Sequence, residues 1–580
     1  MRRASPPLAH RPLAIRGGRR QERNGRSRQG RPFSEGRARR CRPNHADPAM
    51  LTMSSALDRC RRYYADRPAV IDREGRWTWA GHLDRIARLA GGLQALGVKR
   101  GDAFATLSRN TFRNFELLHA GYWMGAVPAP VNIRLAAPEI AYILDNAGAE
   151  VVAVDAPFLG LFDHEALAPW RDRTIRIAGA QDDAAEADPG AAWPEHDYET
   201  LIAAADPAGL HEAQETDPAI LLYTGGTTGR SKGVPLSHRN AVSNGMQVGH
   251  TVGIYSDDVY LHVAPMFHSA DLLGTGFTLM GSGHAFLPAF TPADLLGAIQ
   301  DRGVTWTMLA PTMIIMTLQQ EDLSRYDLSS LRAFLYGSAP MAAEWVERTL
   351  KAFDGVELIQ GYGLTETSPI LTLMSHREHV EAIATGNRER LKAAGRPIIG
   401  VDMRILGPDG REVPNGESGE VVVRAPNVTA GYLNLPEENA RAFRDGWFHT
   451  GDVGRMDDNG FMYLVDRKKD MIITGGENVY SLEVEAALYQ HPAVGECAVI
   501  GIPDSKYGEA LFAAIVPQPG QSVGAEELVA HCRERIGGYK IPRQYAFLPE
   551  LPKSAMGKIL KTALRETYSD PAAERETVAR

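Results

Sequence analysis

The sequence predicts an α/β fold with a large N-terminal domain of layered sheets, a β-rich subdomain and a small α+β domain at the C-terminal end. Three observations predict it. Apolar runs typical of buried strands alternate with helical patterns over the first part of the chain. From residue 396 onward, short strands separated by turn residues dominate. After residues 466–470 the pattern changes to short helices and strands, and 580 residues exceed what one core can hold.

Individual elements follow from the local pattern. Residues 83–96 have the apolar spacing of a helix that ends before Gly97. The runs VVAVD (151–155) and AILLYT (219–224) are typical of buried strands. Residues 180–217 are rich in Ala, Asp, Glu and Pro, so we expect a surface excursion there.

The second half of the chain divides into two regions. VDMRIL, GEVVVRA and FMYLVD predict the strands of the β-rich subdomain, with turns at PDG and DNG. In the small domain we expect helices near 481–490 and 525–536 and strands at ECAVIGI and LFAAIVP. The expected parts are an extension over 1–53, an N-terminal domain over 54–465, a C-terminal domain over 466–570 and a tail over 571–580.

Composition excludes several classes of protein. The chain is 44% hydrophobic and 23% charged, as in ordinary globular proteins, and its net charge of −8 argues against nucleic acid as the main partner. Four cysteines are too few for a disulfide scaffold, so we expect a reducing compartment, the cytoplasm. No apolar run is long enough for a transmembrane helix. The sequence excludes neither a monomer nor a homodimer.

The first 50 residues differ from the rest. They hold 14 arginines, no lysine and only three acidic residues, with frequent Pro and Gly and no apolar period. This composition predicts disorder. It fits either a transit peptide or an upstream stretch translated in error, with the true start at Met50 or Met53; the second interpretation is favoured.

A glycine-rich loop, YTGGTTGRSKG at 223–233, points to phosphate chemistry. Its glycines allow close backbone approach, while its hydroxyls, including Ser231, and Lys232 can surround an anion. It is not a P-loop, because Lys232 does not directly follow a glycine. GRSKG also matches the nucleophile elbow of hydrolases, but no helix can start promptly after Ser231, since Gly233 and Pro235 follow it.

The loop resembles the signature loop of the adenylate-forming superfamily, which includes acyl-CoA synthetases, luciferases and adenylation domains. The resemblance covers residues 54–565. It implies that the loop holds the β- and γ-phosphates of ATP through Thr224, Gly225, Gly226, Thr227, Thr228, Gly229 and Lys232. Relatives usually have Ser at one of the two neighbouring glycines and Pro where Ser231 stands, so fine phosphate contacts differ here.

Two further segments resemble motifs of this family. In QGYGLTET (360–367), the resemblance implies that Tyr362 lies on adenine, that Thr365 binds the α-phosphate and that Glu366 holds Mg²⁺. YGSAP (336–340) resembles the segment between adenine and the acyl site. Together they contribute the expected nucleotide-site residues Gly337, Ser338, Ala339, Gln360, Gly361, Tyr362 and Gly363.

Three later segments complete the resemblance. WFHTGD (447–452) resembles the ribose motif, with Asp452 on the ribose hydroxyls. DRKKDMIITGGENV (466–479) resembles the hinge before the mobile small domain; Arg467 also reaches the ribose, Lys469 is the pivot, and Gly475 and Gly476 line a pantetheine tunnel. PKSAMGKIL (552–560) resembles the C-terminal catalytic motif, in which Lys558 stabilises charge on the carboxylate and α-phosphate. Lys553 and Ser554 depart conservatively from the usual form.

These motifs imply an AMP-forming acid–thiol ligase. PMFHSADLLG (265–274) resembles the acyl-site motif, and His268 stands where relatives that activate amino acids carry Asp. The resemblance therefore implies a carboxylic acid substrate, with His268 near its carboxylate. Apolar runs at 272–280 and 306–316 suit an apolar acyl chain, but core helices and strands have the same pattern, so the length of the acyl chain stays open. A medium- or long-chain fatty acid is the leading expectation, and an aryl or cyclic acid is the alternative. The chain continues only briefly after Lys558, so free coenzyme A is the expected acceptor.

Other functions remain open on the sequence. An adenylating enzyme that loads a carrier protein would form little CoA thioester. A luciferase-like monooxygenase would emit light. A non-catalytic module that binds ATP or an acyl group would release no pyrophosphate.

Overall fold

The computed structural model describes residues 51–178, 196–224, 231–339, 341–467, 470–474, 477–504, 507–553, 559–570 and 573–578. Contacts divide the chain into Met1–Pro48 and Ala49–Arg580, and every described residue belongs to the second unit. Helix α1 (Met53–Tyr63) begins next to the expected domain start at 54, and Thr52 caps it by accepting a hydrogen bond from the Ser55 amide. Residues 1–50 of the expected extension lie outside the described residues.

A nine-stranded sheet forms the centre of the N-terminal part. Its strand order is β16-β15-β14-β13-β12-β10-β11-β1-β2. The strands from β14 to β1 run parallel, so their carboxyl ends meet at one edge, where ligands of open α/β sheets bind. The strands are β1 (Pro68–Ile71), β2 (Arg76–Thr78), β10 (Val259–His262), β11 (Gly283–Phe286), β12 (Trp306–Leu309), β13 (Ala333–Gly337), β14 (Glu357–Tyr362), β15 (Thr372–Met374) and β16 (Arg396–Pro397).

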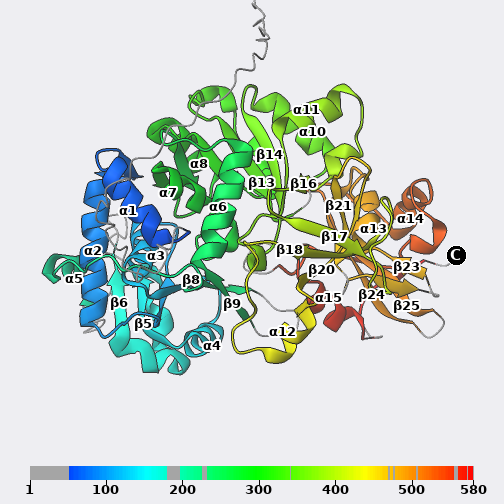
Figure 1. The fold of residues 1–580 in the computed structure, drawn as a ribbon. Helices are drawn as coiled ribbons and strands as arrows, with labels where there is room; N and C mark the ends of the chain where they lie inside the picture. The colour runs from blue at the N-terminus through cyan, green and yellow to red at the C-terminus, as the bar shows by residue number, and fades with distance from the viewer. Residues whose placement is uncertain are drawn as a thin grey trace, which may run out of the picture. The chain divides into compact units, whose positions relative to one another are not determined.

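Helices cover both faces of this sheet. Successive side chains of a strand point to opposite faces. On β13, Phe334 and Tyr336 therefore pack under α8 (Pro292–Arg302), α9 (Pro311–Gln320), α10 (Ala343–Ala352) and α11 (His376–Ala384). Ala333 and Leu335 pack on the other face, under α6 (His238–Val252), the short helix η3 (Ser269–Leu273) and α7 (Gly274–Met280). Figure 1 shows β13 and β14 with α6 on one side and α10 and α11 on the other.

A second, parallel sheet has the order β4-β3-β5-β6-β7. Its elements are β3 (Ala103–Leu107), β4 (Val127–Pro130), β5 (Ala149–Asp155), β6 (Thr174–Ile177), β7 (His196–Asp197), α2 (Trp79–Ala95), α3 (Phe112–Met124), α4 (Ala137–Ala147), α5 (Tyr198–Ala204), η1 (Ala156–Asp163) and η2 (Glu165–Arg173). Helix α2 and strand β5 confirm the predictions for 83–96 and 151–155. The surface excursion predicted for 180–217 is wrong at Tyr198, which is fully buried and donates to Glu116 over 2.7 Å.

Strands β8 (Pro218–Thr224) and β9 (Lys232–Ser237) form an antiparallel hairpin. The strand predicted at 219–224 is confirmed, and its inner residues are buried. Thr224 and Lys232 are register partners, so the glycine-rich loop joins the two strands at their ends.

The β-rich subdomain is confirmed as a five-stranded antiparallel sheet. Its elements are β17 (Asp402–Leu406), β18 (Gly419–Arg424), β19 (Phe443–Arg444), β20 (Trp447–Met456), β21 (Met462–Arg467) and the connecting helix α12 (Pro436–Ala442). Asp452, in the middle of β20, pairs with Arg467 at the end of β21, and both are predicted site residues.

The small α+β region has the predicted elements. They are β22 (Ile472–Thr474), β23 (Glu477–Val479), β24 (Val494–Asp504), β25 (Gly508–Pro517), β26 (Gln544–Phe547), β27 (Glu576–Thr577), α13 (Ser481–Leu488), α14 (Ala525–Arg533) and α15 (Lys561–Tyr568). Separate apolar clusters pack on the two faces of its sheet, one beneath α13 and α14 and one beneath α15. The remaining short helices of the structure are η4 (Leu323–Arg325), η5 (Thr365–Thr367), η6 (Arg390–Lys392) and η7 (Gly538–Lys540).

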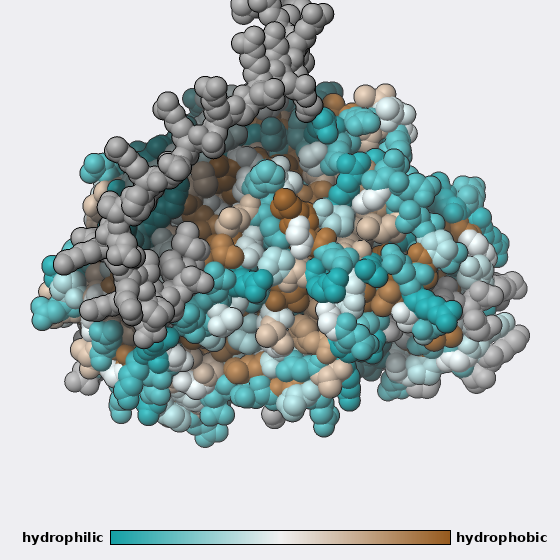
Figure 2. Space-filling model, viewed as in Figure 1, coloured by the Kyte–Doolittle hydropathy of each residue, from teal (hydrophilic) through white to brown (hydrophobic). Residues whose placement is uncertain are grey.

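The surface in Figure 2 is mainly hydrophilic, and hydrophobic residues reach it in small groups near the middle of the view. Among the residues that the structure describes, none of the helices is both long and apolar enough to span a bilayer.

Candidate active site

The predicted nucleotide segments meet at the carboxyl edge of the nine-stranded sheet. Gly337 at the end of β13 pairs with Gly361 near the end of β14. A Cβ on Gly337 would lie 2.5 Å from the Gly361 carbonyl oxygen, and a Cβ on Gly363 would lie 1.8 Å from the Pro369 carbonyl oxygen. Only glycine fits at these two positions, so the backbone forms a close-packed wall.

The residues beside this wall are open. Ser338 adopts a left-handed backbone with a φ of 67°, and both Ser338 and Ala339 are exposed at the edge. Gln360 is buried and accepts a hydrogen bond from the Tyr336 hydroxyl over 3.2 Å. Ser338 and Ala339 are therefore accessible to a ligand, as their predicted roles require. The side chain of Gln360 instead forms a hydrogen bond within the protein.

The residues predicted to bind adenosine form one polar cluster. The Tyr362 hydroxyl donates to Oδ2 of Asp452 over 2.6 Å, and Arg467 Nε lies 2.6 Å from Oδ1 of the same carboxylate. Asp452 is fully buried, whereas Arg467 is about a third exposed. Burial, and then the charge of Asp452, raise the pKa of Tyr362 well above its usual value, so the phenol stays protonated and keeps donating.

A second polar cluster joins Glu366 to Lys232. Glu366 is largely buried in η5, and its Oε1 accepts from the Tyr432 hydroxyl over 2.8 Å. Lys232 Nζ lies 5.2 Å from the centre of the Tyr432 ring and 2.5 Å from Oε2 of Glu438 on α12. The structure therefore brings the predicted metal ligand and the predicted phosphate lysine to two sides of one tyrosine.

Sequence reasoning missed Tyr432 and Glu438. They lie in GYLNLPEEN (431–439), which is not among the segments that carry the resemblance, and no spacing rule connects them to the glycine-rich loop. Glu438 acts on Lys232 electrostatically. The hydrogen bond from Lys232 lowers the pKa of Glu438, so the carboxylate carries a charge that pairs with the lysine. A phosphate that binds the Lys232 ammonium would compete with this carboxylate for it.

The predicted acyl segment lies next to the adenylate motif. Ser269 Oγ and Thr365 Oγ1 lie 3.0 Å apart, and both residues are buried. His268 is half-buried at the start of η3, where its Nδ1 accepts from the Ala270 amide over 3.3 Å. The histidine therefore caps the short helix that carries Ser269, beside the residue predicted to bind the α-phosphate.

A buried hydrogen-bonded chain behind η3 was not predicted. Asp271 Oδ1 lies 2.8 Å from His262 Nδ1, and His262 Nε2 lies 2.9 Å from His284 Nδ1. His284 Nε2 continues the chain to Thr278 Oγ1 at 3.2 Å. These side chains come from η3, two neighbouring strands and α7, so this series of hydrogen bonds connects the acyl segment to the sheet. Isolated histidines in strand patterns give no sequence signal for such a chain.

The carboxylate of Glu366 fits the ion that the resemblance implies. Mg²⁺ is usually held by one or two carboxylates together with substrate phosphates and water, rather than by a cage of protein ligands. Within the described ranges, no group of three or more Cys, His, Asp or Glu residues could hold a metal ion by itself. Glu366 would supply an anionic oxygen to an ion that arrives with the nucleotide.

Several predicted residues lie outside the described residues. They are Gly225, Gly226, Thr227, Thr228, Gly229, Lys469, Gly475, Gly476 and Lys558. Their roles stay predictions.

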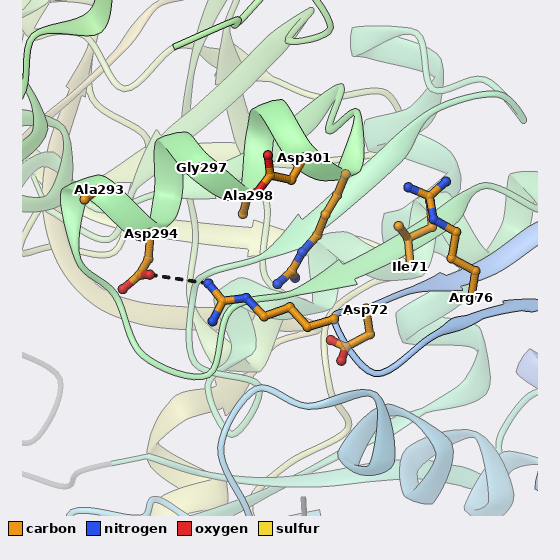
Figure 3. A pocket seen from close by; sticks show the side chains of 10 residues that line it. Ile71, Asp72, Arg76, Ala293, Asp294, Gly297, Ala298 and Asp301 are labelled. Atoms are coloured by element: carbon orange, nitrogen blue, oxygen red, sulfur yellow. Dashed lines mark hydrogen bonds and ion pairs between the residues drawn. The ribbon is translucent and has the colours of Figure 1, made fainter. Parts of the chain in front are cut away.

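A cavity of about 220 Å³ lies between the β1–β2 turn and α8. It is lined by both arginines and aspartates, and the dashed line in Figure 3 marks the ion pair of Asp294 with Arg73 at 3.4 Å. None of the predicted site residues lines it. The opposite charges largely compensate one another, so the cavity offers no site for the phosphate chemistry described above.

Comparisons with known proteins identify the family. Residues 57–433 match the family model of the AMP-binding enzyme, and residues 483–558 match that of its C-terminal domain. The chain is similar to a feruloyl-CoA synthase of Amycolatopsis sp, at 40% identity over 85% of this chain and 94% of that protein. It is also similar to the long-chain-fatty-acid–CoA ligase FadD13 of Mycobacterium tuberculosis, at 35% identity over 85% and 93%.

A solved structure shares the fold. The o-succinylbenzoate CoA synthetase of Bacillus subtilis, in complex with its acyl-adenylate intermediate, aligns with a TM-score of 0.77 and 29% identity over 90% of this chain and 99% of that one. The family models and these relatives confirm the resemblance and the α/β fold drawn from the motifs. The chain therefore belongs to the AMP-binding enzyme family and is an acid–thiol ligase of the adenylate-forming type.

Proposed function

We propose that this enzyme joins a compact, ring-bearing carboxylic acid to coenzyme A at the expense of ATP. The carboxylate attacks the α-phosphorus, pyrophosphate leaves, and the resulting acyl-adenylate reacts with the thiol of coenzyme A to give a thioester and AMP. Catalysis of such a reaction depends on positioning and on offsetting charge.

The residues at the sheet edge supply both requirements. Tyr362, Asp452 and Arg467 orient the adenosine, and the backbone around Gly337 and Gly361 forms the wall against which it packs. When Mg²⁺ is bound with ATP through Glu366, it offsets phosphate charge. Lys232 exchanges Glu438 for a phosphate oxygen, and Lys558 adds a positive charge beside the reacting carboxylate.

The acyl group is proposed to lie on the sheet face that η3 covers. Ala270 and Leu273 of η3 pack there with Met308 and Leu335, next to Ser269 and Thr365. The face is lined by alternate residues of β13, from Gly337 at the edge down to Ala333. The four residue steps from Gly337 to Ala333 span about 13 Å, which sets the length of the proposed acyl site.

Aromatic side chains close the far end of this face. Trp306 pairs with Ala333 in the sheet, and Tyr260 pairs with Trp306 on the next strand. Phe277 of α7 packs on both, with ring centroids 4.7 Å from Tyr260 and 5.9 Å from Trp306. This closure is the observation that carries the proposal, because it favours a short acyl group over a long one.

The relatives support both acid classes. The feruloyl-CoA synthase acts, by its name, on a ring-bearing acid, and so does the succinylbenzoate enzyme. FadD13 supports the fatty acid that the sequence favours, and the apolar lining from Met308 and Leu335 suits such a chain as well. A fatty acid is therefore the second candidate.

The test is AMP release by the full chain across a panel of acids, with and without coenzyme A. We expect ring-bearing acids of cinnamate size to give the highest kcat/KM, and fatty acids to lose activity as the chain grows beyond the length of the closed face. Activity that rises steadily to long-chain acids would contradict the compact acyl site.

The same assay separates the rival functions. Adenylate formed without any transfer to coenzyme A would indicate a carrier protein as the acceptor, light emission would indicate a luciferase-like oxygenase, and a lack of pyrophosphate release with every acid would indicate a binding module.

A further inference from the structure

Two polar atoms at the closed end of the acyl face have no partner. The hydroxyl of Tyr260 and the Nε1 of Trp306 are buried and make no hydrogen bond, although both side chains are fully enclosed. A buried polar group without a partner destabilises the folded protein, and native proteins satisfy the great majority of such groups. Two of them on neighbouring strands therefore call for an explanation.

The two groups belong to one place in the fold. Tyr260 and Trp306 are register partners on the parallel strands β10 and β12, so both side chains point to the same face of the sheet. Both contact the ring of Phe277, and they belong to the same apolar cluster as Ala270 and Leu273 of the acyl segment.

A movable side chain separates this place from the catalytic edge. Met308 follows Trp306 by two residues on the same face of β12, and its methyl carbon lies 3.8 Å from where a Cβ of Gly337 would stand. Methionine is unbranched and adapts its shape to what packs against it. An acyl group that enters beside Gly337 can displace this side chain and reach the aromatic end.

The chemistry of the two atoms defines what they can bind. The indole Nε1 is a donor only, and a phenol hydroxyl donates and accepts. Burial, and then the charge of Asp271, raise the pKa of Tyr260 well above its usual value, so its hydroxyl remains protonated. The complementary ligand atom is an oxygen that accepts hydrogen bonds, such as a hydroxyl, methoxyl or carbonyl oxygen.

We propose that Tyr260 and Trp306 form a specificity site for an oxygen substituent at the distal end of the acyl group. The inference rests on the proposed function, because it places the acyl group on this face. A site built to hydrogen-bond a substrate group rejects the analogue that lacks it, since the protein's own buried polar atoms then stay unpaired.

The test compares pairs of acids in the full-length enzyme. Each pair consists of a phenylacrylic acid and its derivative with one ring hydroxyl or methoxyl opposite the side chain, and the readout is kcat/KM for AMP release. We expect the wild-type enzyme to prefer the oxygenated acid by roughly tenfold to a hundredfold, the range that one or two buried hydrogen bonds supply.

Tyr260→Phe removes only the unpartnered oxygen and should abolish most of this preference, mainly by raising KM for the oxygenated acid. Trp306→Phe removes the indole donor and should likewise abolish most of the preference for the oxygenated acid. Because Tyr260→Phe deletes an unsatisfied atom from the core, it should leave thermal unfolding unchanged or improve it.

Tyr545→Phe is the matched control. Tyr545 is likewise fully buried, and its hydroxyl likewise has no partner, but it lies in the core of the small α+β region. We expect it to leave the preference intact. An equal preference in wild type and Tyr260→Phe, or the same loss in Tyr545→Phe, would overturn the specificity site.

The outcomes separate this inference from the proposed function. If neither acid of any pair yields AMP, the compact-acid proposal itself fails and the site fails with it. If both acids are activated equally well by the wild-type enzyme, the proposed function stands and only the specificity site is overturned.

Discussion

Glu366→Gln should slow adenylate formation by roughly a hundredfold to a thousandfold, the loss typical of removing one group that stabilises a charged transition state. Glutamine has the same shape and can still accept the hydrogen bond that the Tyr432 hydroxyl donates to Oε1. It lacks the negative charge by which a carboxylate binds a divalent cation more strongly than a neutral oxygen does. The measurement is pyrophosphate release from ATP and acid, titrated with Mg²⁺.

The Mg²⁺ titration separates a metal ligand from a structural residue. We expect the variant to need more Mg²⁺ for half-maximal activity, which a loss of packing would not cause. Glu321→Gln is the matched control, since Glu321 also accepts from a tyrosine, Tyr326, over 3.0 Å but lies away from the predicted site. An unchanged Mg²⁺ requirement in Glu366→Gln would show that Glu366 does not hold the ion.

Lys558→Ala should abolish adenylate formation yet leave transfer from supplied acyl-AMP to coenzyme A largely intact. The proposed role of Lys558 is to offset the charge that develops on the carboxylate and α-phosphate, and that charge arises only in the first half-reaction. The fall should again be on the order of a hundredfold or more. Single-turnover assays of the two half-reactions measure it.

Lys553→Ala serves as the control for this variant. Lys553 lies in the same segment, but its ammonium pairs with Glu496 over 2.6 Å at the surface of the small region. We expect both half-reactions to persist when it is removed. If Lys558→Ala slows the two half-reactions equally, the lysine is not specific to adenylation.

The sequence predicts those elements well that depend on interactions between residues close together in the chain. Strand β8 follows from its apolar run and α2 from its helical period, and both were confirmed. The clustering of Tyr362, Asp452 and Arg467 also follows from the motifs, because the resemblance assigns all three residues to one adenosine.

Contacts that join distant segments could not be predicted from local pattern. Tyr198 sits in a stretch with a surface-like composition, but it is buried because its hydroxyl meets Glu116 of α3. Glu438 pairs with Lys232 across a large separation in sequence, and the chain from Asp271 to His284 joins separate elements. Such pairs depend on tertiary packing, which no periodicity encodes.

In the proposed reaction, the carboxylate attacks the α-phosphorus of ATP. The most direct measurement uses a substrate acid whose carboxylate carries a heavy oxygen isotope, followed by mass analysis of the products after transfer to coenzyme A. Attack at the α-phosphorus, then cleavage of the carbonyl–oxygen bond by the thiol, predicts one labelled oxygen in AMP and none in pyrophosphate. Label in inorganic phosphate together with ADP would show attack at the γ-phosphorus and would exclude an acyl-adenylate intermediate.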